Sequence, residues 1–202
     1  MQPRATLCST MRMWFFLSIT MSTVSCSSVV YQPTPVVPTK YPLPFSVKVK
    51  LAQIDSYMVE PGSTMLADPA IENHVTRTSS SLDDAKKQWE KSIADYVAAR
   101  KTFSYLSMDS QTDLDMTLRL NIYIDPGVLF QFNHVYIAKV DAKVIDSTSQ
   151  AVLSSYQGFR KSIGEVSRGG AEDDRAPVNQ AVQASLDNLL SKVENDSRLR
   201  RP

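Results

Sequence analysis

The chain of 202 residues contains little cysteine and little histidine. Its two cysteines, Cys8 and Cys26, both lie in the first 26 residues, so the rest of the chain cannot form disulfides or offer thiolates to zinc. The only histidines are His74 and His134, and neither neighbours a motif that activates a serine. We therefore expect no cofactor, no Cys/His metal site and no enzymatic activity.

The chain also lacks an excess of positive or negative charge. The formal net charge is +1, and the residues from Cys26 onward carry 20 basic and 21 acidic side chains. A near-neutral chain lacks the basic footprint of a nucleic-acid-binding protein, and no stripe of basic residues with interleaved aromatic residues replaces it. We expect no nucleic-acid partner.

The amino-terminal apolar run, residues 13–21, is short. It has about half of the roughly 20 residues that a membrane-spanning helix needs. Two arginines precede it and the small residues 22–25 follow it, an order that is typical of a secretory signal peptide. We assign residues 1–25 to a signal peptide. Three methionines qualify as its start: Met1, Met11 and Met13.

Residues Thr23-Val24-Ser25-Cys26 resemble the lipobox of bacterial lipoproteins, in which the cysteine is acylated on its sulfur and becomes the first mature residue. The resemblance implies a lipid on Cys26. In that family a serine after the cysteine, here Ser27, implies the outer membrane, with the domain facing the periplasm. The alternative is a free cysteine near an ordinary cleavage site.

A proline-rich segment, residues 26–44, follows the cysteine and holds five of the eleven prolines. Proline fixes φ and removes a backbone donor, so we expect an extended, semi-rigid tether. At about 3.1 Å per residue it would hold a domain up to about 55 Å from the lipid. A disordered linker without further purpose predicts the same composition.

Residues 45–197 predict a single α+β domain, followed by a solvated basic tail at 198–202. Strands are predicted where apolar and polar residues alternate, at 45–51, 114–124, 136–144 and 152–159. Helices are predicted where apolar residues recur every three to four positions, from about 81 to 103 and from 177 to 193. The order strand, helix, strand, strand, strand, helix predicts a mainly antiparallel sheet with two helices packed on one face.

Two features frame the first helix. Ser81 and Asp84 have the spacing of a capping box at its start. Before it, residues 55–80 predict a long loop that is either mobile or functional.

This order of elements is similar to that of envelope lipoproteins and periplasmic proteins related to the amino-terminal domain of the Tol-system translocation protein. The resemblance lies in residues 98–103, which close the first helix, 112–115, which open the strongest strand, and 140–146 before a turn. It implies the same architecture and partners among envelope proteins, but no particular site residues.

One apolar cluster is a candidate partner-contact site, at the connection between two predicted strands. Its members are Val128, Leu129, Phe130 and Phe132. Exposed together, they would form a patch of the kind that marks protein or membrane contacts. Alternatively, the two phenylalanines begin the next strand and pack inside.

Other candidate sites have simpler structural explanations. Trp89, Tyr96 and Phe103 follow helical spacing, which favours core packing over a ligand-binding box. The aspartates Asp109, Asp113 and Asp115 bracket a turn but lack the pattern of a calcium loop. The acidic run 172–174 precedes the last helix, where acidic residues complement the helix dipole.

These patterns lead to one preferred function and two alternatives. We expect a lipid-anchored outer-membrane lipoprotein that binds other envelope proteins, or further copies of itself, as an accessory subunit of an assembly, secretion or transport system. The first alternative is a carrier or sensor of a lipid or small apolar ligand held between sheet and helices. The second is a hydrolase.

Overall fold

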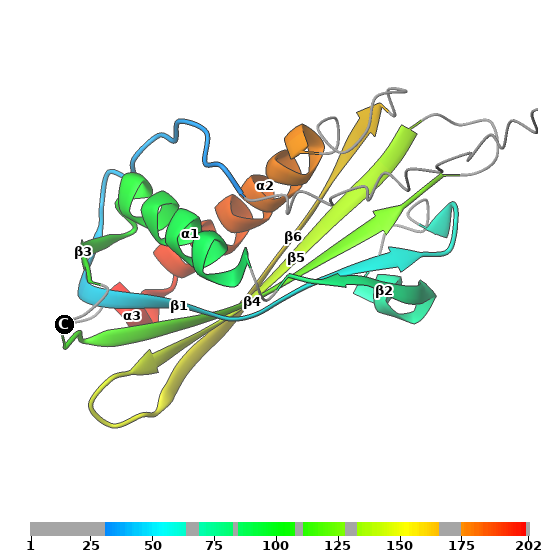
Figure 1. The fold of residues 1–202 in the computed structure, drawn as a ribbon. Coiled ribbons are helices and arrows are strands. Elements are labelled where there is room, and N and C mark those ends of the chain that lie inside the picture. Colours follow the sequence, from blue (N-terminus) through cyan, green and yellow to red (C-terminus); the bar gives the residue numbers. More distant parts are fainter. Residues whose placement is uncertain are drawn as a thin grey trace, which may run out of the picture.

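The computed structural model describes residues 31–63, 69–82, 85–107, 111–127, 133–165 and 175–200. Six strands form one sheet in the order β2-β1-β4-β5-β6, with β3 paired to β1 (Figure 1). The strands are β1 (Leu43–Val59), β2 (Val75–Ser81), β3 (Phe103–Leu106), β4 (Leu114–Asp125), β5 (Asn133–Asp146) and β6 (Val152–Glu165).

The sheet is mainly antiparallel, as predicted, but it is mixed, because two of its strand pairs are parallel. Strands β4, β5 and β6 form the predicted antiparallel meander, and β2 lies antiparallel to β1. Strand β1, however, is parallel to β3 and to β4. The cause is the helix between β1 and β4, because a crossover connection brings the chain back in the same direction.

The two main helices, α1 (Lys86–Arg100) and α2 (Arg175–Glu194), cover one face of the sheet, as predicted (Figure 1). Between them and the strands lies the main core. Trp89 and Tyr96 are fully buried there and Phe103 is 6% exposed, which confirms their assignment to the core. Among the described residues, no helix combines the length and the apolar character that crossing a bilayer requires.

A bulge in β1 explains why its second half escaped prediction. The register against β4 shifts between Leu51 and Gln53, so the next inward side chain after Leu51 is Ile54 rather than Gln53. Helix α1 satisfies the backbone at the bulge. A carboxylate oxygen of Glu90 accepts a hydrogen bond from the Leu51 N–H at 2.8 Å, and Lys86 Nζ donates to the Ala52 carbonyl at 2.6 Å.

The predicted loop at 55–80 is largely ordered structure. It contains the end of β1, the 3-10 helix η2 (Pro69–His74) and β2. Ser81 ends β2, so the capping-box prediction is wrong, and α1 begins after Ala85 without a side-chain cap. The short helix η2 covers a second, smaller core on the other face of the sheet, formed by Val59, Ile71, Tyr123 and Ile137.

The carboxyl end also differs from its prediction as a solvated tail. Residues Ser197–Arg200 form the short helix α3, and Leu199 is buried in the main core. Arg198 beside it pairs with Asp196 at 2.6 Å and stays exposed. The basic residues Arg198 and Arg200 therefore flank a leucine that anchors α3 to the core.

Candidate functional site

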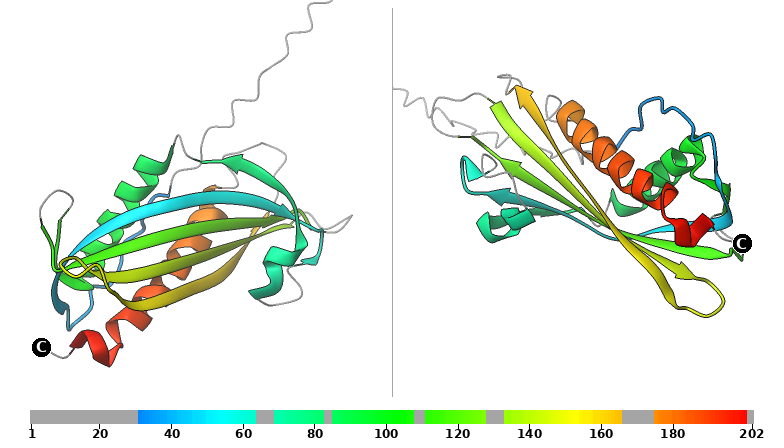
Figure 2. Two further views of the ribbon diagram at one scale, coloured as in Figure 1. Left: turned by 90° about the horizontal axis from the view of Figure 1, so that it is seen from below. Right: turned by 180° about the vertical axis from the view of Figure 1, so that it is seen from behind.

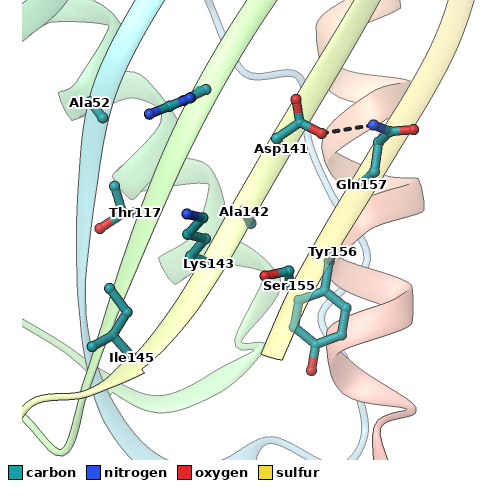
Figure 3. Close-up of a pocket in the computed structure, with 10 residues that line it drawn as sticks. Ala52, Thr117, Asp141, Ala142, Lys143, Ile145, Ser155, Tyr156 and Gln157 are labelled. Carbon is teal, nitrogen blue, oxygen red and sulfur yellow. Dashed lines mark hydrogen bonds between the residues drawn. The ribbon is translucent and has the colours of Figure 1, made fainter. Parts of the chain in front are cut away.

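A groove of about 590 Å³ lies on the face of the sheet opposite α1 and α2 (Figure 3). Viewed from below, the strands lie in front of these two helices (Figure 2). Strand alternation places the groove residues, because Leu118 and Ala142 point into the main core and their neighbours point the other way. The outward side chains that line the groove are Ala52, Thr117, Arg119, Asp141, Lys143, Ile145, Ser155 and Gln157.

The strand register brings polar side chains together across the groove. Arg119 lies opposite Asp141, and Lys143 lies between Thr117 and Ser155. Asp141 Oδ1 accepts a hydrogen bond from Gln157 Nε2 at 2.8 Å, drawn as a dashed line in Figure 3. Within the described part of the chain, neither Arg119 nor Lys143 forms an ion pair.

The groove and its rim carry more positive than negative charge. On the rim, Lys50 Nζ pairs with Asp115 Oδ2 at 3.3 Å, and Lys48 stands beside them on β1. The lining itself holds two cations, Arg119 and Lys143, and one carboxylate, Asp141. Such a surface suits carboxylates, since an arginine offers a planar fork of donors and a lysine a point charge.

The groove offers no evident catalytic chemistry. Its lining includes neither cysteine nor histidine that would serve as nucleophile or base. Among the described residues, no three histidine, cysteine, aspartate or glutamate side chains come together as a metal site.

A second feature is the segment 31–42, here called the docked segment, which lies across α1 and α2 (Figure 1). Tyr31 is fully buried. Its ring stacks on Trp89 with centroids 6.1 Å apart and meets Tyr96 edge-on at the same distance. Tyr31 thus completes the core between the two helices.

Polar contacts hold the rest of the docked segment. The Thr34 N–H and hydroxyl both donate to Gln183 Oε1, at 2.9 and 2.7 Å. Further along, the Thr39 N–H donates to the Arg100 carbonyl at 2.8 Å. The prediction of a free spacer is therefore wrong for this half of the tether, because donors between the prolines bond to the helices instead of water.

Arg100 joins the ends of α1 and α2 beneath the docked segment. Its guanidinium donates to Glu194 at 2.8 and 3.1 Å, to Ser191 Oγ at 3.0 Å and to Asp187. The Tyr96 hydroxyl also donates to Asp187. The hydrogen bonds to Glu194 raise the pKa of Arg100, whereas burial raises that of Tyr96. This network fixes the platform on which the segment lies.

Several carboxylates have a pKa below the ordinary value because donors stabilise the charged form. The Lys139 ammonium lowers the pKa of Glu72, and Arg198 lowers that of Asp196. Backbone N–H donors from Ser46 and Ser149 do the same for two turn aspartates, Asp113 and Asp146. These carboxylates are ionised throughout the neutral range.

Acidification should therefore destabilise the fold. A carboxylate with a lowered folded-state pKa contributes stability above its unfolded value, here 3.8 for aspartate and 4.5 for glutamate, and loses it as pH falls through the folded value. We expect a constant melting temperature from neutral pH down to about pH 5 and a fall below it. Glu72→Gln should reduce that fall, and a melting temperature that rises on acidification would contradict the assignment.

Two of the predicted sites lie outside the described residues. These are Cys26 and the cluster Val128, Leu129, Phe130 and Phe132, and both stay predictions. Asp109 and the acidic run 172–174 lie outside as well.

The other candidates have structural partners. Asp113 accepts two hydrogen bonds from Ser46, both at 2.7 Å, and Asp115 pairs with Lys50. His74 contacts Glu60 at 3.1 Å, and His134 contacts the Tyr136 hydroxyl at 3.2 Å. Neither of these contacts is with a serine, threonine or cysteine.

Sequence reasoning missed both the groove and the docked segment. The polar positions of the alternating strands did identify a face that meets water, which is the signal for the groove. The docked segment gave no such signal, because its prolines suit a spacer equally well.

Comparisons with known proteins find similar folds only. No family model and no curated protein matches the chain. Protein XCC0632 from Xanthomonas campestris, of family DUF330, has 14% identity and a TM-score of 0.49, with 82% of this chain and 91% of that chain covered. A homologue of the neuraminyllactose-binding haemagglutinin from Helicobacter pylori has 11% identity and a TM-score of 0.42, covering 82% and 94%.

A candidate lipoprotein from Caulobacter crescentus is also similar. It has 12% identity and a TM-score of 0.33, with 50% of this chain and 72% of that chain covered. All three TM-scores are below 0.5, so these likenesses assign no function to the chain.

Proposed function

We propose that the chain is a lipoprotein of the bacterial envelope, anchored in the outer membrane by acyl chains on Cys26. Its domain faces the periplasm and acts as an accessory subunit that binds another protein of an assembly, secretion or transport system. The signal-like amino terminus and the lipobox-like residues 23–26 support the anchor.

The groove is the surface that best supports protein binding. Charged and polar side chains stand in it beside Ala52 and Ile145, and it lies on the sheet face that α1 and α2 leave uncovered. Its cations Arg119 and Lys143, which form no ion pair with another described residue, complement a partner segment that carries carboxylates. This excess of positive charge on an open sheet face is the observation that carries the proposal.

Charge removal tests this role. A photo-crosslinking residue placed at exposed Ser155 should capture a specific protein in cells, and Arg119→Gln with Lys143→Gln should reduce that product. Losing two interfacial charge contacts weakens binding roughly tenfold or more. Lys161→Gln, on β6 with Ser155 but outside the groove lining, is the matched control and should leave the product unchanged.

The test compares the amount of crosslinked product in the double variant with that in the control. Capture of an unidentified protein alone does not support binding through the groove. If the double variant and the control capture the same protein equally, the groove does not bind this partner.

A carrier of lipid or of a small apolar ligand needs room between sheet and helices. Tyr31, Trp89 and Tyr96 fill that region, and all three are fully buried. Protein binding therefore has better support than ligand carriage.

A further inference from the structure

The docked segment carries unusually exposed apolar side chains. Six large apolar residues of the described chain are exposed, and two of them, Val37 (86%) and Tyr41 (71%), lie on this segment. A third, Tyr105 (61%), lies on β3, where it borders the same surface hollow as Pro42. Exposed tyrosines of this kind suit a boundary between water and an apolar phase.

Lysines stand beside these residues. Lys40 precedes Tyr41. Lys101 follows the last residue of α1 as its C-cap, in the left-handed conformation at φ 56°. It borders the hollow together with Tyr105. Both lysines are exposed. Among the described residues, neither forms an ion pair. We call this group the anchor-side surface, made of Val37, Lys40, Tyr41, Lys101 and Tyr105.

The docked segment also limits how far the domain can stand from its lipid. Because Tyr31 is fixed in the core, only the five residues from Cys26 to Val30 remain as a leash. Five residues span at most about 18 Å when fully extended. That is about a third of the roughly 55 Å expected for a tether that is free along its whole length.

We propose that the anchor-side surface rests on the bilayer that holds the lipid of Cys26, with its tyrosines and Val37 at the headgroup level and its lysines against anionic headgroups. The inference depends on the proposed lipidation. Apolar and aromatic side chains beside lysines are the combination that interfacial membrane contacts use. The groove, on the sheet face opposite α1 and α2, is then turned away from this membrane and open to a partner.

Site-specific labels test this orientation. In the mature chain the only native thiol is Cys26, which acylation blocks, so an introduced cysteine is the single labelling site. Ala98→Cys places a fluorophore on α1 at the hollow that Tyr105 borders, and Lys143→Cys places it in the groove. The acylated mature chain, which begins at Cys26, is then incorporated into nanodiscs of phosphatidylethanolamine and phosphatidylglycerol that contain a nitroxide lipid.

We expect nitroxide quenching to be several-fold stronger at Ala98 than at Lys143. Two changes should reduce the difference in quenching between the two label sites. Tyr41→Ser with Tyr105→Ser removes the aromatic contact while leaving the core intact, and a ten-residue Gly/Ser insertion between Val30 and Tyr31 lengthens the leash. Equal quenching at both sites in the unmodified chain would overturn the proposed orientation.

The mass of the Cys26 peptide from the same sample separates the two proposals. An unmodified cysteine would overturn the lipid anchor itself. An acylated cysteine with equal quenching would overturn only the membrane contact.

Discussion

Tyr31→Ala is expected to lower the free energy of unfolding by about 3 kcal/mol, the range found for buried aromatic residues cut back to alanine. The ring of Tyr31 is fully buried between Trp89 and Tyr96, so its removal leaves a cavity between the helices. The loss should appear as a lower midpoint in urea denaturation followed by tryptophan fluorescence, because Trp89 lies against the missing ring.

Tyr41→Ala is the matched control, because Tyr41 lies on the same docked segment with 71% of its surface exposed. Its effect should stay within about 0.5 kcal/mol, as is usual for surface substitutions. If Tyr31→Ala proves as mild as Tyr41→Ala, segment 31–42 is not docked and the tether is free after all.

Gly158→Ala is expected to cost about 3 kcal/mol, at the upper end of the range for overpacking. Gly158 lies on β6 beneath α2, where an added Cβ would come within 2.0 Å of the Ser185 carbonyl oxygen. That oxygen belongs to the helix backbone, so relief requires α2 to move away from the sheet. Thermal unfolding measured by circular dichroism should show a large drop in melting temperature.

Ser155→Val provides the control for Gly158→Ala, since Ser155 lies on the same strand but faces the open side of the sheet. The added bulk meets solvent there, and a β-branched residue suits a strand, so the change should stay within about 0.5 kcal/mol. Equal effects of the two substitutions would mean that α2 does not approach β6 as closely as described.

The sequence predicted best where local pattern and tertiary environment agree. Strand β4 alternates without interruption, and its predicted range differs from the structure by one residue. Strand β1 was predicted only up to the bulge at Ala52, because a single extra residue there reverses which side chains face the core. The parallel pairing of β1 with β4 depends on the path of the chain through α1, which side-chain periodicity does not report.

The groove and the docked segment differ in the same way in how far the sequence predicted them. The polar side chains of the groove alternate along their strands, so the open face of the sheet was predictable even though the groove itself was not. Tyr31 contacts residues that lie 58 or more positions away, and its local sequence is that of a linker. Its place in the core follows from tertiary packing alone, and the contacts of residues 31–42 with the helices correct the prediction that this half of the tether is a free spacer.

Lipid attachment at Cys26 is tested most directly by metabolic labelling with a palmitate analogue in Gram-negative cells that express the full chain. Wild-type protein should carry the label, and Cys26→Ser should carry none, because acylation needs the cysteine sulfur. Cys8→Ser, which changes the other cysteine within the signal segment, should label like wild type. Equal label on wild type and Cys26→Ser would contradict the anchor at Cys26.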